Sequence, residues 1–251
     1  MWLMMGIEMP LINAVIARLN DAKANLAAFG VTLAIALIIE SPVIQLLAAG
    51  TALADNRKNY KRLMSFMHIL AIVLTVLHLI LALTPLYGLL LQYVLRVPLD
   101  IIPLSRRAFI WMFPFSAAVG YRRLWQGVLI RYGNTKVIPN TMISRLIATA
   151  IILFAGFHFP SLSGAEVGGI ALSFGVVTGA VSSYIYLHPL TKEFKETDGQ
   201  EELSWSRLVK FYFPLALTNF VTFIVRPVLT FGIARAVFPL ESLAIWPVVT
   251  S

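Results

Sequence analysis

Five charged side chains stand inside long apolar stretches of this chain of 251 residues: Glu8, Glu40, Arg122, Arg123 and Arg226. Charges are costly in the hydrocarbon of a bilayer, so they usually pair with one another or face a polar cavity. A buried carboxylate can bind a proton or a cation, and a guanidinium can bind an anion through its fork of N–H groups. These residues therefore predict ion or substrate binding inside a membrane protein, not enzymatic catalysis.

Glu8 and Arg226 are the strongest candidates because a proline lies close to each, Pro10 and Pro227 respectively. A proline inside a helix frees a backbone carbonyl and bends the helix, which favours an element with two conformations. We expect Glu8 and Arg226 to lie at one depth near mid-bilayer and to face each other across a central cleft, as a gate or an ion relay. Glu8 is the candidate for binding a coupling ion, a proton or sodium. The alternatives are a structural ion pair or two unrelated residues that face the cavity.

The other three charges have more than one interpretation each. Glu40 precedes Ser41 and Pro42, where we expect a bend, so it lies either at a helix end that faces water or in a cavity. Arg122 and Arg123 line the cleft, or extend their side chains to the membrane surface, or lie in an interfacial turn because the helix ends early at Gly120.

The remaining polar residues suggest no further site. Arg145 stands eight residues into its apolar segment and is expected to reach the cytoplasmic surface. His68 and His78 are expected to pack, and no carboxylate–histidine cluster has the spacing of a metal site. The chain has no cysteine and no phosphate-binding loop, so no metal, cofactor or ATP is expected. Glycines at four-residue spacing, such as Gly175 and Gly179, are typical of close helix packing.

Composition places these residues in an integral membrane protein that is all α-helical. Hydrophobic residues make up 59% of the chain, charged residues only 13%, and the mean hydropathy is +0.81. The net charge of +8 is better explained by basic cytoplasmic loops than by binding to nucleic acid, which we do not expect. A spanning helix needs about 20 mostly apolar residues. By that measure the predicted spans are a segment ending near Ala17, then 26–53 with a bend near Pro42, 63–83, 108–130, 137–157, 167–187 and 211–237, with 86–95 as an interfacial piece.

Lysines and arginines are more frequent in alternate loops, which predicts the orientation of the spans. The loops after the second, fourth and sixth spans hold ten of them and the other loops hold five. The first set is therefore expected in the cytoplasm, so that the N-terminal side of the first span is cytoplasmic and the protein is multi-pass.

A repeat relates the two ends of the chain at a constant offset of 217 positions. An even number of spans separates the copies, so we expect a parallel repeat, as in transporters built from two related bundles. The expected organisation is an N-terminal lobe of six helices over 1–188, a cytoplasmic loop over 189–210 and the start of a second lobe over 211–251. We expect the chain to be a fragment of a transporter of roughly twelve helices, with the start of its first helix missing. The identical pairs are Pro10/Pro227, Ile16/Ile233, Ala17/Ala234, Arg18/Arg235, Leu26/Leu243, Ala27/Ala244 and Val31/Val248.

Several short motifs of the chain carry a resemblance to a known group of transporters. They are Arg106-Arg107-Ala108-Phe109, Phe113-Pro114-Phe115, Phe213-Pro214-Leu215-Ala216-Leu217, Arg226-Pro227, Glu8 and Leu26-Ala27-Ala28-Phe29-Gly30. With these motifs the chain resembles the multidrug/oligosaccharidyl-lipid/polysaccharide exporter superfamily. Within it the chain is most similar to the multidrug and toxic compound extrusion (MATE) branch and to relatives of the progressive ankylosis protein.

This resemblance implies a secondary antiporter, driven by protons or sodium, with a cleft between two lobes and alternating access. Glu8 stands where such transporters carry a carboxylate for the coupling ion, usually an aspartate. The ankylosis-type relatives imply small anions such as pyrophosphate or citrate, which the arginines at Arg122, Arg123 and Arg226 would suit. The expected partners are the bilayer of the cell membrane and a small-molecule substrate, with a monomer as the full-length state. A flippase for lipid-linked precursors and a scaffold without transport remain alternatives.

Overall fold

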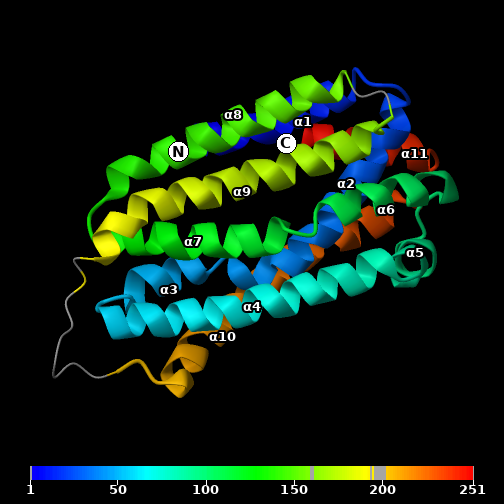
Figure 1. Ribbon diagram of the computed structural model, residues 1–251. Helices are drawn as coiled ribbons and strands as arrows, with labels where there is room; N and C mark the ends of the chain where they lie inside the picture. The colour runs from blue at the N-terminus through cyan, green and yellow to red at the C-terminus, as the bar shows by residue number, and fades with distance from the viewer. Residues whose placement is uncertain (1, 159–160, 193, 195–201, 251) are drawn as a thin grey trace.

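The computed structural model describes residues 2–158, 161–192, 194 and 202–250, with the side chains of residues 2–5 excepted, and this part is helical without β-strands. The α-helices are α1 Trp2–Ile16, α2 Ala22–Glu40, α3 Leu46–Leu53, α4 Arg57–Leu83, α5 Leu86–Leu89, α6 Ile102–Trp111, α7 Phe115–Arg131, α8 Ile138–Gly156, α9 Gly164–Thr191, α10 Trp205–Ile233 and α11 Pro239–Val249. Short 3-10 turns at Ser41–Val43, Leu99–Ile101 and Thr135–Val137 and a π-helical turn at Leu90–Leu95 connect them. In Figure 1, α4, α7, α9 and α8 lie side by side in this order with their axes roughly aligned, and the chain runs in one direction in α4 and α8 and in the opposite direction in α7 and α9.

Several helical segments are long and apolar enough to cross a membrane, which makes this a multi-pass membrane protein. Within the described residues they are Ala22–Leu53, Arg57–Leu83, Thr135–Gly156, Gly164–Thr191 and Trp205–Ile233. The central one is Ala22–Leu53, because 72% of its apolar window is buried against other helices, compared with 11% for Trp205–Ile233. The segments Gly6–Ile16, Leu86–Leu95 and Pro239–Val249 are apolar but shorter.

The predicted span 108–130 is wrong as a continuous helix. The structure divides it into α6 and α7, with a turn at residues 112–114 between them. The physical reason is Pro114, which has no N–H to donate and whose ring would clash with the carbonyl one turn earlier. Pro114 instead caps the start of α7.

The chain between α9 and α10 is held against the base of α4. Asn59 accepts a hydrogen bond from the backbone N–H of Leu203 at 2.8 Å, and Lys58 lies 2.9 Å from the carboxylate of Glu202. The hydrogen bond and the charge of Lys58 lower the pKa of Glu202. The connection between the two helices is shorter than the predicted loop over 189–210, because α9 extends to Thr191 and α10 begins at Trp205. Residues 193 and 195–201 of this connection lie outside the described part.

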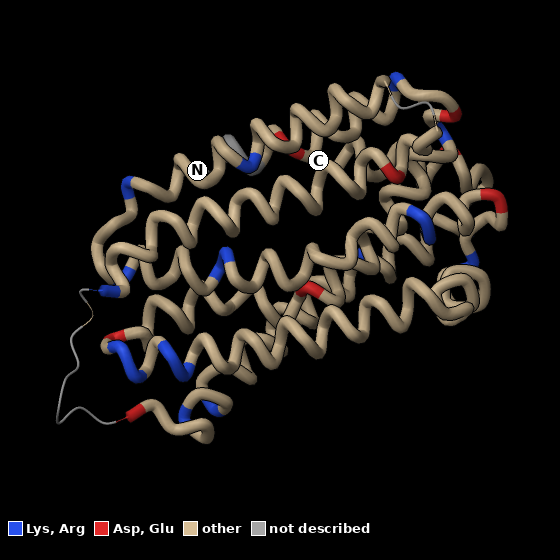
Figure 2. The backbone as a smooth tube through the Cα atoms, in the orientation of Figure 1, with Lys and Arg blue, Asp and Glu red and all other residues tan. Residues whose placement is uncertain are grey.

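The offset of 217 positions also relates the helix boundaries. It maps Ile16, the end of α1, onto Ile233, the end of α10, and it maps Ala22, the start of α2, onto Pro239, the start of α11. The two second helices, α2 and α11, pack against each other. Figure 2 shows lysines and arginines gathered at the end of the bundle where α3 meets α4 and α7 meets α8.

Candidate functional site

A cavity of about 290 Å³ brings the five predicted site residues together. Helices α1, α2, α7, α8, α9, α10 and α11 form its walls, and apolar side chains such as Leu33, Phe115 and Trp246 line much of it. The charged residues of the lining, within the described chain, are Glu8, Glu40, Arg122, Arg123, Arg145 and Arg226. Four arginines and two glutamates give the lining a formal excess of two positive charges.

Glu8 is bound by residues of α8. Arg145 donates from Nε to Glu8 Oε1 at 2.8 Å and from Nη2 to Oε2, and Thr149 donates from Oγ1 to Oε1 at 3.0 Å. Arg145 and Thr149 are four residues apart, so they lie one above the other on the same face of α8. Glu8 is only 6% exposed, and both of its carboxylate oxygens have donors, in the two-pronged geometry that favours arginine over lysine.

Two expectations about this region are corrected. Arg145 does not reach the membrane surface, because it is only 9% exposed and its guanidinium donates hydrogen bonds to Glu8. Glu8 consequently pairs with Arg145 and not with Arg226, although Arg226 lines the same cavity. Sequence reasoning missed Arg145 as a site residue, and the sequence held no signal that Arg145, and not Arg226, lies against Glu8.

Glycines of α9 make room for the polar side chains. A Cβ atom on Gly175 would lie 2.2 Å from Thr149 Oγ1 and 3.4 Å from Glu8 Oε1, and one on Gly179 would lie 3.2 Å from Arg122 Cδ. The glycine spacing that predicted close helix packing therefore also admits the buried charges.

Glu40 and the two arginines of α7 form the second charged group. Glu40 is the last residue of α2, and the 3-10 turn around Pro42 follows it. Tyr212 of α10 donates a hydrogen bond to the backbone carbonyl of Pro42, which fixes the turn. Helix α7 continues without a break from Phe115 to Arg131, so the interfacial turn considered for Arg122 and Arg123 does not form.

Several polar atoms of this second group are buried and lack partners. They are Glu40 Oε2, Arg122 Nε and Nη1, and Arg123 Nε. Arg122 is 2% exposed and Glu40 is 6% exposed. Among the described residues, no hydrogen bond or ion pair joins Glu40 to Arg122 or Arg123, although both arginines lie close enough for their charge to act on it. Buried N–H groups of this kind normally have partners, so this part of the cavity is suited to an anion.

A family model described as Progressive ankylosis protein (ANKH) matches residues 5–242 of the chain. The chain belongs to the progressive ankylosis protein family. The family is one of membrane transport proteins, in agreement with the apolar spans and the charged cavity between them. No curated protein and no solved structure shows a significant match. All six charged residues of the cavity fall within the region matched to the ankylosis family.

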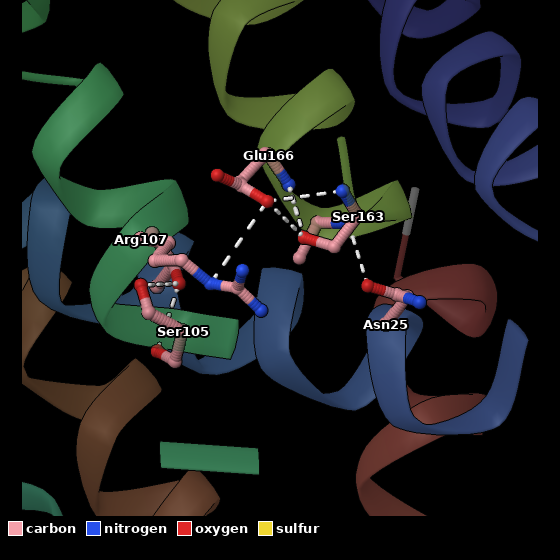
Figure 3. A network of polar contacts seen from close by, with 7 residues as sticks. Asn25, Ser105, Arg107, Ser163 and Glu166 are labelled. Atoms are coloured by element: carbon pink, nitrogen blue, oxygen red, sulfur yellow. Dashed lines mark hydrogen bonds and ion pairs between the residues drawn. The ribbon is translucent and has the colours of Figure 1, made fainter. Parts of the chain in front are cut away.

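A second polar network of this ankylosis-family chain lies away from the cavity (Figure 3). Ser163 and Glu166 cap the start of α9 reciprocally, and Asn25 of α2 accepts a hydrogen bond from the N–H of Ala165 at 2.9 Å. Arg107 of α6 stands 4.0 Å from Glu166. These groups satisfy one another and connect α2, α6 and α9, so we assign them a structural role.

The histidines also have structural partners. His78 is buried, its Nε2 lies 2.8 Å from the backbone carbonyl oxygen of Phe109 in a hydrogen bond, and its ring stacks on the Phe109 ring. The ring of His68 lies against that of Tyr121. In the described part of the chain no group of three or more His, Cys, Asp or Glu residues is arranged to hold a metal ion.

Proposed function

We propose that the chain exports a small anion of the pyrophosphate or citrate class across the cell membrane, with the charged cavity as its binding site. The observation that carries the proposal is Arg122, which is almost completely buried in the cavity with two guanidinium nitrogens that lack partners. Arg123 and Arg226 add to the positive charge of the same lining. An anion would supply the missing acceptors and neutralise the excess charge.

Alternating access between two lobes, as in MATE-like exporters, is the mechanism that we propose. Support comes from the repeat, whose offset relates the boundaries of α1 and α2 to those of α10 and α11. Support also comes from prolines in the helices around the cavity: Pro10 lies inside α1, Pro227 inside α10, and Pro42 interrupts the helix between α2 and α3. Such positions allow a helix to change its bend at low cost. We place the basic loops and the N-terminal side of α1 in the cytoplasm.

A MATE-like antiport cycle with a proton or sodium on Glu8 would require this carboxylate to leave Arg145 and Thr149, because they occupy both of its oxygens. A flippase for lipid-linked precursors would use similar arginines. The cavity of about 290 Å³ favours a small anion over a lipid diphosphate with its attached sugar, since pockets for drug-sized molecules are typically about 300–1,000 Å³.

Uptake of labelled pyrophosphate or citrate into liposomes that contain the purified full chain tests this function. Arg122→Gln removes the charge and the guanidinium group and keeps a shorter polar side chain. A hydrogen bond to a charged group contributes about 1.5–3 kcal/mol, so uptake at low anion concentration should fall roughly ten- to a hundredfold.

Arg18→Gln is the matched control, because Arg18 is exposed at the end of α1 and donates to the carbonyl of Ala14. It should transport like the unaltered chain. Equal uptake by the Arg122 and Arg18 variants, or transport of a lipid-linked precursor instead of either anion, would contradict the proposal.

A further inference from the structure

The two glutamates of the cavity are in opposite situations. Glu8 has donors on both carboxylate oxygens, from Arg145 and Thr149. Glu40 is buried to the same extent, but its Oε2 has no partner. A buried carboxylate oxygen without a donor is unfavourable, and a proton on it converts it into a donor that can use a nearby acceptor.

The charged groups that face Glu40 come from four helices. Arg122 and Arg123 of α7 and Arg145 of α8 act on it as positive charges, and Arg226 of α10 lines the same cavity. Glu8 of α1 forms an ion pair with Arg145, so these two charges largely offset each other and the main positive charges near Glu40 are those of α7. Arginines with which Glu40 forms no hydrogen bond or ion pair therefore favour its charged form, while its burial opposes that form.

An anion bound to Arg122 and Arg123 would reverse this balance. It would take the free N–H groups of both arginines and cancel the positive field that now acts on Glu40. A charged Glu40 would then be a like charge beside the anion in an apolar surrounding, and a proton on Oε2 would remove the repulsion. Anion binding and protonation of Glu40 would favour each other, and such linkage is reciprocal.

We propose that Glu40 is the proton-binding residue of this transporter, and that one proton passes from bulk water to the Glu40 carboxylate for each anion bound at Arg122 and Arg123. This coupling rests on the proposed function and adds that the anion and the proton occupy the cavity together and cross the membrane together. Glu8 offers no such open oxygen, because Arg145 and Thr149 donate to both oxygens of its carboxylate.

Calorimetric titration of the purified full chain with pyrophosphate, in two buffers of different ionisation enthalpy, counts the protons taken up per anion. Glu40→Gln keeps the shape of the side chain and cannot titrate. After subtraction of the value for Glu40→Gln, which corrects for protons bound by pyrophosphate itself, the unaltered chain should take up about one proton. Linkage to one proton weakens anion binding by up to about tenfold for each unit of rising pH, and this excess dependence should be absent in Glu40→Gln.

Glu241→Gln is the control, because Glu241 is an exposed acid that pairs with Lys23 at the end of the bundle. It should behave like the unaltered chain, and the melting temperature of each variant verifies its folding. Binding with equal proton uptake in the unaltered chain and in Glu40→Gln would overturn this inference alone and leave the proposed function standing. Absence of pyrophosphate and citrate binding in the unaltered chain would overturn both.

Discussion

The two glutamates of the cavity differ in their contacts with arginines, and we assign them different roles on that basis. Glu8 joins α1 to α8 through Arg145 and Thr149, in contacts that are buried and complete. Glu40 faces Arg122 and Arg123 without touching them. We therefore regard the Glu8 pair as a structural contact of the resting conformation, and the Glu40 group as the part of the site that is available to a ligand.

Arg145→Met tests the structural role of the Glu8 pair. It leaves the Glu8 carboxylate buried without a counter-charge, and loss of one partner of a buried pair typically costs about 3–5 kcal/mol. We expect a clearly lower melting temperature in detergent, and a partial recovery when Glu8→Gln is added, because that change removes the stranded charge. Lys23→Met, which breaks an exposed ion pair with Glu241, should change the melting temperature much less. Equal effects of the two single changes would contradict the assignment.

The sequence alone predicted which charges lie near one another better than it predicted how they pair. Charges inside apolar stretches are conspicuous, and the structure places all five predicted residues around one cavity. The pairing of Glu8 with Arg145 was not predictable, because sequence gives the depth of a residue in a span but not which helix lies against its face. Topology decides this by packing α1 against α8 and α9.

Among the helices, α9 contributes glycines that leave room for the polar side chains around the cavity. Gly175→Ala should displace Thr149 and disturb Glu8, since the added Cβ would lie 2.2 Å from Thr149 Oγ1. We expect both a lower melting temperature and reduced anion uptake. Gly232→Ala in α10 is the matched control: nothing lies within 4 Å of its added Cβ. Alanine is favoured over glycine inside a helix by about 1 kcal/mol, so this control should be neutral or slightly stabilising.

Hydropathy predicted the five long apolar helices found within the described residues, but it predicted the interruptions of the spans only in part. The bend at Pro42 was predicted, and the structure has a 3-10 turn there. The interruption at Pro114 was not, because apolar residues continue on both sides of it and hydropathy does not register a lost backbone hydrogen bond. Both interruptions lie beside the cavity, since Glu40 precedes the first and Phe115 follows the second.

Across the whole chain, one contact joins two positions that the repeat makes equivalent. The offset of 217 positions maps Gly30 of α2 onto Pro247 of α11, and these two residues touch: a Cβ on Gly30 would lie 3.1 Å from Pro247 Cγ. Under the parallel repeat that we propose, equivalent positions meet only near the axis that relates the two copies, so this contact would lie near that axis. Both residues also line the cavity.

Alternating access requires α2 and α11 to separate or pivot near this contact, and a cross-link tests that requirement. A Cβ on Gly30 would lie 3.4 Å from Pro247 Cβ, which is close to the separation of about 3.5–4.5 Å found in disulfides. The chain has no cysteine of its own, so Gly30→Cys combined with Pro247→Cys introduces one defined pair. We expect oxidation to form the disulfide and stop anion uptake, reduction to restore it, and each single variant to be insensitive to oxidant. Full uptake by the oxidised, cross-linked protein would show that α2 and α11 stay together during transport, and the pathway would then have to open elsewhere around the cavity.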